Sequence, residues 1–283
     1  FGIGMLVACT LVVSPHAHAS VIYTDGGVIC NGSTGAQTFK DPNGNVSTST
    51  LTDGNGYYST VAGCGANGND KLAVTLFGAG SQVTADYGTA LGFLSQAAGS
   101  ATAVGVQASA TGATSVAIGY NAKATAVNAV AIGGVANGVT TSATNAFSVA
   151  LGAGAVSNGF ETVAVGTSAS AANNQDQAFG AAASAQGAGT GPIFQKSNPS
   201  NNNNFAGVDP LDLAVAPGAA TAMGSAAHAK GASASAYGDN ANALAGGTTA
   251  LGGLATASAS NATAVGVKST ATGASAVAIG DTA

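Results

Sequence analysis

The stretch Ser115-Val116-Ala117-Ile118-Gly119 returns fourteen residues later as Ala129-Val130-Ala131-Ile132-Gly133. Its final glycine recurs at this spacing along most of the chain, apart from two longer intervals. A fixed period held over many copies is typical of a solenoid, in which each copy forms one coil and stacks on the next. The repeated glycines are Gly105, Gly119, Gly133, Gly152, Gly166, Gly180, Gly224, Gly238, Gly252, Gly266 and Gly280.

The positions around this glycine predict two strands per coil. We number the glycine as position 0. Position −1 carries a larger apolar residue and position −3 mostly Val or Thr, and these two positions lie on the same face of a strand. Small residues at +3 and +5 indicate a second short strand facing the first. Fourteen residues accommodate two strands of about five residues and two tight turns, and the glycine gives one turn its backbone freedom. The coil is therefore predicted to be a two-sided β-roll.

Alanine occupies position −2 in all twelve coils when Gly92, thirteen residues before Gly105, is included. The residues at −1 and −3 are predicted to fill the interior of the roll, so this alanine is predicted to point outward. A solvent-facing position would accept Ser, Lys, Asn or Glu at little cost. We therefore expect a second buried face, on which copies of the chain pack through these alanines, and hence a homo-oligomer.

The units quoted above, together with Ser275-Ala276-Val277-Ala278-Ile279-Gly280, resemble the head repeat of trimeric autotransporter adhesins, the family of the Yersinia adhesin. The resemblance covers residues 87–186 and 218–283. It implies a left-handed parallel β-roll, three chains around one axis and display on a Gram-negative outer membrane. As partners it implies host extracellular-matrix proteins or cell-surface molecules, and it also implies cell–cell aggregation.

Composition excludes one class of partner. Charged residues make up 6% of the chain, its net charge is −5 and its pI is near 4.7. Six lysines are scattered without a cluster, and there is no arginine. Nucleic-acid binding needs a basic stripe that neutralises phosphates, so no nucleic-acid partner is expected.

The first nineteen residues are predicted to be a signal peptide. Residues 3–13 are uncharged, and Ala17-His18-Ala19 before Ser20 has the small-x-small form of a cleavage site between Ala19 and Ser20. The segment lacks an initiating Met and a basic start, so we expect its true N-terminus to lie further upstream. An alternative is a lipobox at Leu6-Val7-Ala8-Cys9, with Cys9 lipidated.

Residues 20–86 show no period and are predicted to form a β-rich lead-in or cap. Turn signals at Asp41-Pro42-Asn43-Gly44 and Asp53-Gly54-Asn55-Gly56 separate short β-prone runs. The segment holds Cys30 and Cys64, which we expect to pair as an intrachain disulfide in an oxidising periplasm. Two free thiols and an interchain bond are the alternatives.

Two interruptions break the period. The interval from Gly133 to Gly152 has about five extra residues, which predict one enlarged turn within 134–146. The second, residues 187–217, is rich in proline and asparagine and is predicted to be an inserted loop on the surface. It could be a passive loop or a ligand-contacting element.

Residues suited to catalysis are sparse. His228 is the one histidine outside the signal segment, in a predicted turn-side stretch, and Glu161 is the one glutamate. Neither has a partner in the sequence that would form a metal site or an acid–base pair. The stretch Gly266-Val267-Lys268-Ser269-Thr270 lacks the glycine that a phosphate-binding loop has before its lysine. We therefore predict no enzyme activity, no cofactor and no metal.

Three functions remain. Surface adhesion follows from the resemblance and the export signal. A structural spacer without its own ligand is the alternative. Ice binding is a further one, because Thr221, Ser235, Thr249 and Thr263 form a hydroxyl column on successive coils. The sequence stops at Ala283 midway through a coil, so we expect a stalk and a membrane anchor beyond it, with membrane contact through that anchor alone.

Overall fold

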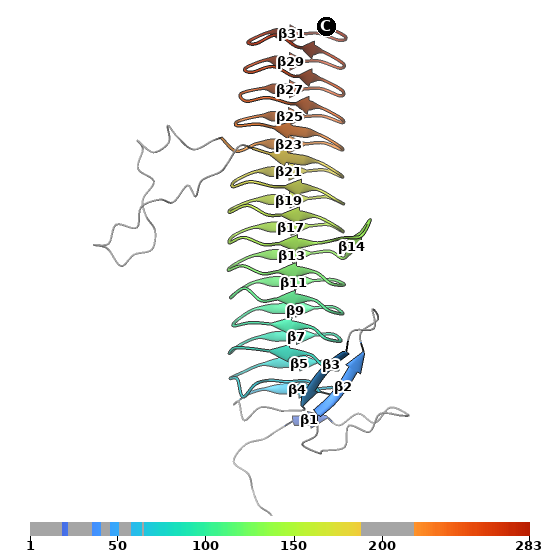
Figure 1. The fold of residues 1–283 in the computed structure, drawn as a ribbon, viewed down its shortest axis with the longest axis vertical. Coiled ribbons are helices and arrows are strands. Elements are labelled where there is room, and N and C mark those ends of the chain that lie inside the picture. Colours follow the sequence, from blue (N-terminus) through green and yellow to red (C-terminus); the bar gives the residue numbers. More distant parts are fainter. Residues whose placement is uncertain (1–18, 22–35, 41–45, 51–57, 64, 188–217) are drawn as a thin grey trace, which may run out of the picture.

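The computed structural model describes residues 19–21, 36–40, 46–50, 58–63, 65–187 and 218–283. In this part of the chain every regular element is a strand and there is no helix. The strands stack into a long column, one coil on the next (Figure 1). This arrangement confirms the predicted all-β roll of about fourteen-residue coils.

Each coil contributes one strand to a fifteen-stranded parallel sheet, which we call the first sheet. These strands carry positions −3 to −1 of the repeat. They are β1 (Ala19–Val21), β4 (Thr60–Ala62), β5 (Thr75–Phe77), β7 (Thr89–Leu91), β9 (Thr102–Val104), β11 (Val116–Ile118), β13 (Val130–Ile132), β17 (Val149–Leu151), β19 (Val163–Val165), β21 (Gln177–Phe179), β23 (Thr221–Met223), β25 (Ser235–Tyr237), β27 (Thr249–Leu251), β29 (Thr263–Val265) and β31 (Val277–Ile279).

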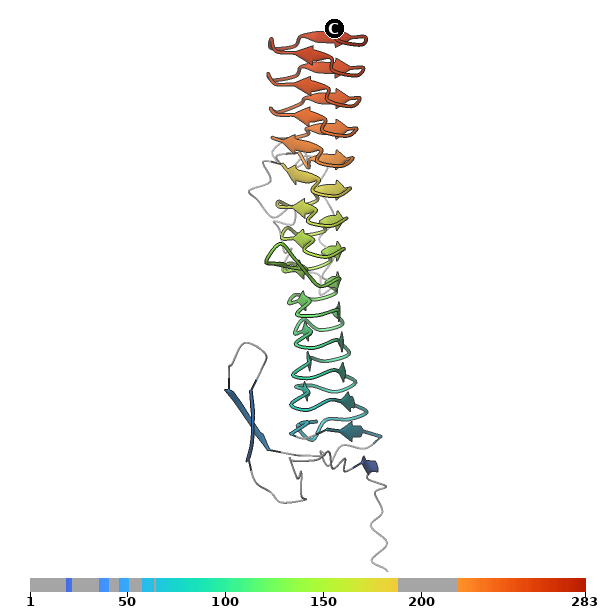
Figure 2. The same cartoon turned by 90° about the vertical axis from the view of Figure 1, so that its right-hand side faces the viewer.

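The returning strands form a twelve-stranded parallel sheet, which we call the second sheet and which lies against the first (Figure 2). They are β6 (Gln82–Val83), β8 (Gln96–Ala97), β10 (Ser109–Ala110), β12 (Lys123–Ala124), β16 (Ser142–Ala143), β18 (Val156–Ser157), β20 (Ser170–Ala171), β22 (Ser184–Gln186), β24 (His228–Lys230), β26 (Asn242–Ala243), β28 (Thr256–Ala257) and β30 (Thr270–Ala271). All these strands have two or three residues, fewer than the predicted five, because the two turns take the rest of each coil.

The prediction about which side chains face inward was wrong at the first strand. The alanines at −2, such as Ala117 and Ala264, are 0% exposed inside a single chain. The residues at −1 and −3 point outward instead, and Ile118 beside Ala117 is 36% exposed. The invariant alanine is thus explained by the interior of the roll, and no second chain is needed to bury it.

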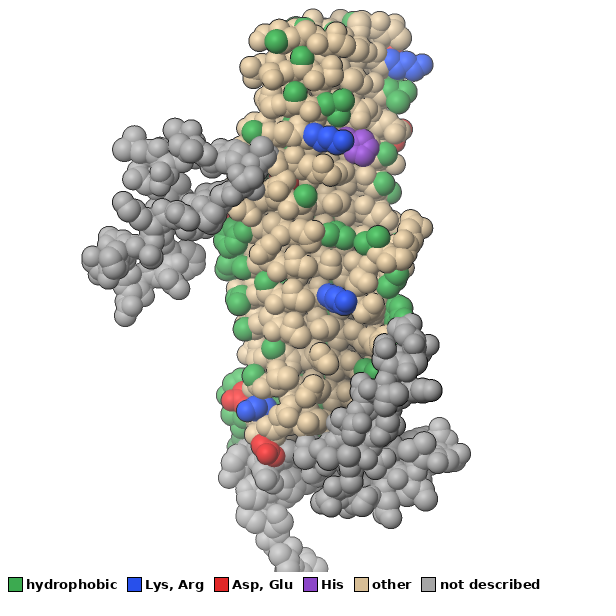
Figure 3. Space-filling model, in the orientation of Figure 1, with side chains coloured by type: hydrophobic (Ala, Val, Ile, Leu, Met, Phe, Trp, Pro, Cys, Tyr) green, Lys and Arg blue, Asp and Glu red, His purple; other side chains and the backbone are tan. Residues whose placement is uncertain are grey.

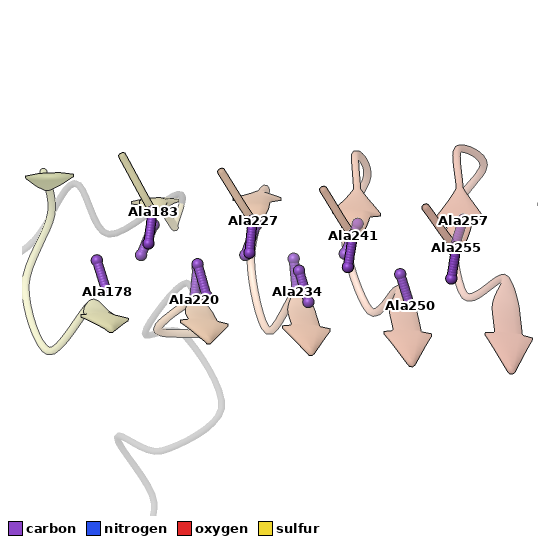
Figure 4. Packing of buried hydrophobic residues seen from close by; sticks show 14 of the residues in the cluster. Ala178, Ala183, Ala220, Ala227, Ala234, Ala241, Ala250, Ala255 and Ala257 are labelled. Carbon is purple, nitrogen blue, oxygen red and sulfur yellow. The ribbon is translucent and has the colours of Figure 1, made fainter. Parts of the chain in front are cut away.

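The thickness of the roll gives the physical reason. Alanines at −2 meet alanines at +3 and +5 of the second strand across the interior, and their methyl groups point toward one another (Figure 4). Mostly small side chains fit where two short strands joined by tight turns lie so close, and closely packed interiors resist larger ones. The prediction that the residues at +3 and +5 face the first strand is confirmed.

Serine and threonine replace alanine inside some coils without leaving a polar atom unpaired. Ser115 donates its hydroxyl to the carbonyl of Gly112 at 2.7 Å, and Thr162 does the same to Gly159 at 2.7 Å. Each hydroxyl bonds the carbonyl three residues earlier, within its own turn. Among the described residues no buried side-chain polar atom lacks a partner, so these substitutions carry no desolvation penalty.

The repeated glycine begins the turn that leaves the first sheet. All eleven glycines of the series have φ between +124° and +148°. A Cβ placed on Gly152 would lie 2.6 Å from the carbonyl oxygen of Gly166, the equivalent glycine of the next coil. Both the backbone conformation and the close stacking of coils therefore require glycine at position 0.

The parallel ladder extends into the segment predicted to be a lead-in without repeats. Strand β4 pairs in register with β5, and β5 with β7. Gly63 and Gly78 occupy position 0 with φ of +129° and +140°. Val61 and Leu76 replace the alanine at −2 and are buried. The period is hard to see here because the inward residues are larger and the spacing is irregular.

A separate antiparallel hairpin, β2 (Ala36–Lys40) and β3 (Val46–Thr50), flanks the turn signal predicted at residues 41–44. The turn itself lies outside the described residues, and so does the second signal at 53–56. Cys30 and Cys64 also lie outside them, so their pairing stays a prediction.

Candidate functional site: an exposed apolar face and two excursions

The outward face of the first sheet is the most distinctive surface of the chain. Its −1 positions form an unbroken apolar row along the column, flanked by the Val and Thr residues at −3. Ile132 is 38% exposed, Leu251 47% and Ile279 71%. The row consists of Phe77, Leu91, Val104, Ile118, Ile132, Leu151, Val165, Phe179, Met223, Tyr237, Leu251, Val265 and Ile279.

The outward face of the second sheet is polar by comparison. Figure 3 shows few hydrophobic side chains across the face that carries the histidine. Outward positions here are Gln82, Gln96, Ser109, Lys123, Ser142, Val156, Ser170, Ser184, His228, Asn242, Thr256 and Thr270. The two faces of one thin roll thus differ in chemistry, and among the described residues nothing packs over the exposed side chains of the apolar face.

His228 lies in strand β24, so its predicted position in a turn-side stretch was wrong. Its neighbours along the second sheet are Ser184 and Asn242. In the described part of the chain no three His, Cys, Asp or Glu side chains gather as metal ligands would. The described residues also contain no apolar helix long enough to cross a membrane.

The first interruption is a β-hairpin that projects from one edge of the column (Figure 1). Strands β14 (Val135–Ala136) and β15 (Val139–Thr140) pair antiparallel and are joined by Asn137 and Gly138, whose φ values are +52° and +77°. Asn-Gly with both residues at positive φ is the preferred two-residue hairpin turn. This dipeptide is a sequence signal from which a β-hairpin, and not only an enlarged turn, could have been predicted.

The second interruption lies in the turn that leads from the second sheet back to the first, on the edge opposite the hairpin. It does not interrupt the strand pairing of either sheet. Strand β21 pairs directly with β23, and β22 with β24. Gly187 and Gly218 stand at the two ends of the insert and both belong to coils, whereas residues 188–217 lie outside the described part of the chain. Removing those thirty residues restores an interval of fourteen between Gly180 and Gly224.

A buried carboxylate, which the sequence reasoning missed, holds both ends of this insert. Asp176 is 0% exposed and occupies an interior position where other coils have Ala, Ser or Thr. It accepts hydrogen bonds from the backbone N–H of Gly187 at 2.9 Å and of Ala220 at 2.8 Å. It also accepts one from Asn173 N–H at 3.0 Å. A carboxylate can accept from several donors at once, which a serine hydroxyl could not match.

The predicted cleavage residues Ala19 and Ser20 lie in strand β1, which pairs with β4. Cleavage between them would leave Ser20 at the start of this strand. The cleavage site stays a prediction.

These features define a class of protein: a repetitive β-roll with an alanine-rich interior, one polar face and one exposed apolar face. Comparison with known families then shows which family's repeat the coils match. The YadA head domain repeat matches residues 77–95, 98–122, 110–134, 219–241, 243–269 and 257–283. The coils of the column thus carry YadA head repeats, the repeat of trimeric autotransporter adhesin heads, which are an adhesive and non-enzymatic family. No curated protein matches the chain.

Proposed function

We propose that this chain is the surface-exposed head of a trimeric autotransporter adhesin that attaches the cell to host extracellular matrix or host cells. It would also mediate cell–cell aggregation. In this proposal the chain is exported through the periplasm, assembles as a homotrimer and is held at the Gram-negative outer membrane by a C-terminal anchor. The observation that carries the proposal is the apolar row of the first sheet, on a chain whose repeats match the YadA head.

The apolar row favours assembly because of its extent. It follows thirteen strands of the first sheet, which corresponds to about 58 Å at the usual spacing of neighbouring strands. Soluble monomers rarely expose a continuous apolar surface of that length. Three chains that turn this face toward a common axis would bury it completely and close the assembly.

The polar face of the second sheet would then form the outside of the trimer. Its Gln, Ser, Asn and Thr side chains repeat along the column at the strand spacing. Repetition on three chains, and on many copies at a cell surface, lets individually weak contacts add up by avidity. This favours adhesion to a repetitive or abundant ligand, such as a matrix protein.

A binding assay on plates coated with collagen or other matrix proteins tests the adhesive role. The purified chain, first verified as a trimer by its solution mass, is compared with a charge-matched control protein. We expect salt-resistant binding that decreases sharply when the trimer is dissociated. If a verified trimer binds no matrix protein and no host cell, the chain acts as a spacer of a surface fibre instead.

The hydroxyl column Thr221, Ser235, Thr249 and Thr263 lies at position −3, on the same outward face as the apolar row. In the trimer these hydroxyls would be covered. Ice binding would require this face to be free, so a trimer that buries it argues against that function.

A further inference from the structure

An apolar patch interrupts the turn edge that leads from the second sheet back to the first. It consists of Val127, Phe147 and Phe160, one from each of three consecutive coils, and we call it the aromatic patch. Val127 is 48% exposed and Phe147 49%. The rings of Phe147 and Phe160 pack edge to face with centroids 5.6 Å apart and planes at 80°, a favourable geometry for aromatic pairs.

Between residues 105 and 276 the aromatic patch is a local departure from the rest of this edge, whereas nearer the N-terminus Tyr87 holds an equivalent turn position and is 58% exposed. The corresponding turn positions of other coils between residues 105 and 276 carry small or polar side chains. They are Ala113 and Thr114, Asn174 and Gln175, Gly218 and Ala219, Ala232 and Ser233, Gly246 and Gly247, Ser260 and Asn261, and Ala274 and Ser275. At these two turn positions, large apolar residues between residues 105 and 276 are thus confined to the three coils that begin at Gly119, Gly133 and Gly152.

The hairpin β14–β15 projects at the same level of the column, from the opposite edge. It leaves the coil of Gly133 at its first turn, and Phe147 lies in the second turn of that same coil. The hairpin exposes two apolar side chains, Val135 at 37% and Val139 at 42%. The middle coil of the aromatic patch is therefore the coil that carries the hairpin.

The adjacent coils hold the hairpin in place. The preceding coil contributes Asn121, whose side-chain amide donates to Thr140 Oγ1 at 3.4 Å. In the following coil Gly154 leaves room for the hairpin, because a Cβ there would lie 3.1 Å from Ala136 Cβ. The hairpin is thus presented in a defined direction, away from the column.

We propose that the hairpin of one chain covers the aromatic patch of the next chain in the trimer. This inference rests on the homotrimer of the proposed function. Rotation about an axis along the column keeps equal levels of the three chains together. Three flat chains that turn their first sheets to that axis form a triangle, so the first-turn edge of each chain meets the second-turn edge of its neighbour. Such head-to-tail contacts close into a ring, and two apolar surfaces at one level then bury each other.

Cysteine cross-linking tests this arrangement in the full chain. Asn137 at the hairpin tip and Glu161 beside the aromatic patch, both exposed, are replaced together: Asn137→Cys with Glu161→Cys. The matched control pairs Asn137→Cys with Asn261→Cys. Asn261 is exposed and has the same turn position and left-handed backbone as Glu161 (φ +58° against +55°). It lies five coils further on, about 24 Å away along the column. The single variants control for pairing with Cys30 and Cys64.

We expect covalent dimers and trimers from the Asn137–Glu161 pair under mild oxidation, at several-fold higher yield than from the Asn137–Asn261 pair. The added variant Phe147→Ser should reduce that yield several-fold. If the solution mass shows a trimer but both pairs cross-link equally or not at all, the hairpin does not cover the patch, while the trimer stands. If the chain is monomeric, the proposed trimer and this inference both fail. If thiol labelling of Glu161→Cys rises only when residues 188–217 are removed, that segment covers the patch and the inference is wrong.

Discussion

At the scale of single residues, the inward-facing alanine side chains at position −2 determine how closely the two sheets of the roll pack. The period of the repeat and the alternation of the first strand could be predicted from the sequence, because both follow from spacing alone. The inward face could not, since the usual rule places the larger apolar residue inside. That rule fails here because the interior is one methyl layer on each side, as at Ala117 and Ala124, which are 0% exposed.

Replacement of Ala117 or Ala264 by lysine should therefore unfold the roll of each chain. The new charge would lie between the two sheets with no partner, at a cost of about 3 to 5 kcal/mol. Thermal melting followed by circular dichroism measures this loss. The same replacement at the outward neighbour, Ile118→Lys, is the control and should leave the β-signal of the chain in place. Equal melting temperatures for wild type and Ala117→Lys would contradict the methyl-filled interior.

The glycine at position 0 should not tolerate even one methyl group. Gly152→Ala places a Cβ 2.6 Å from the Gly166 carbonyl oxygen at a φ of +126°, and we expect a loss of about 1 to 3 kcal/mol. Gly273→Ala is the control, because its added Cβ would lie 3.5 Å from Ala276 Cβ in ordinary contact. Denaturant unfolding compares the two variants. A loss of equal size in both would show that the strain is not specific to position 0.

Asp176 should matter more for stability than its solvent-exposed counterparts. Asp176→Ala leaves three backbone N–H groups without this acceptor, and the bonds from Gly187 and Ala220 are buried, so we expect a loss of about 1 to 3 kcal/mol. The exposed Asp239→Ala should change stability by less than about 0.5 kcal/mol. Limited proteolysis should also cut Asp176→Ala faster between Gly187 and Gly218. Wild-type stability and proteolysis of that variant would mean that the carboxylate does not secure the insert.

At the scale of elements, the two interruptions show what sequence could and could not predict. The sequence predicts where the two interruptions lie, because the interval between successive position-0 glycines exceeds fourteen residues there. Their forms depend on contacts that spacing does not reveal. The hairpin had a readable signal in Asn137-Gly138, whereas Asp176 had none, because a lone aspartate in a repeat is usually exposed. The parallel ladder also begins earlier than the alanine period indicates, because Val61 and Leu76 stand where later coils have alanine.

Deletion of residues 188–217 should leave the column folded and associated. Joining Gly187 to Gly218 restores the fourteen-residue interval, and the coils on either side already pair strand to strand. We expect a melting temperature within a few degrees of wild type. Binding to matrix-coated plates should persist if the roll surface carries adhesion. Loss of binding by an intact trimer would assign adhesion to the deleted segment.

At the scale of the whole molecule, the proposed trimer uses one face of the roll for assembly and the other for display. The first sheet presents an apolar row that a single chain leaves exposed, and the second presents polar side chains. An adhesive head needs both, because avidity requires several copies held together with one chemistry facing outward. A repeat that stacks coils by backbone pairing and methyl contact can extend this arrangement to any length.

The solution mass of the purified full chain, measured by sedimentation equilibrium, tests this account most directly. We expect the wild type to be three times the chain mass at micromolar concentration. The double variant Ile118→Lys and Ile132→Lys, which changes the outward row alone, should have the mass of a single folded chain. A wild type that remains a folded monomer, or a double variant that remains a trimer, would contradict the claim that the first sheet is the surface on which three chains assemble.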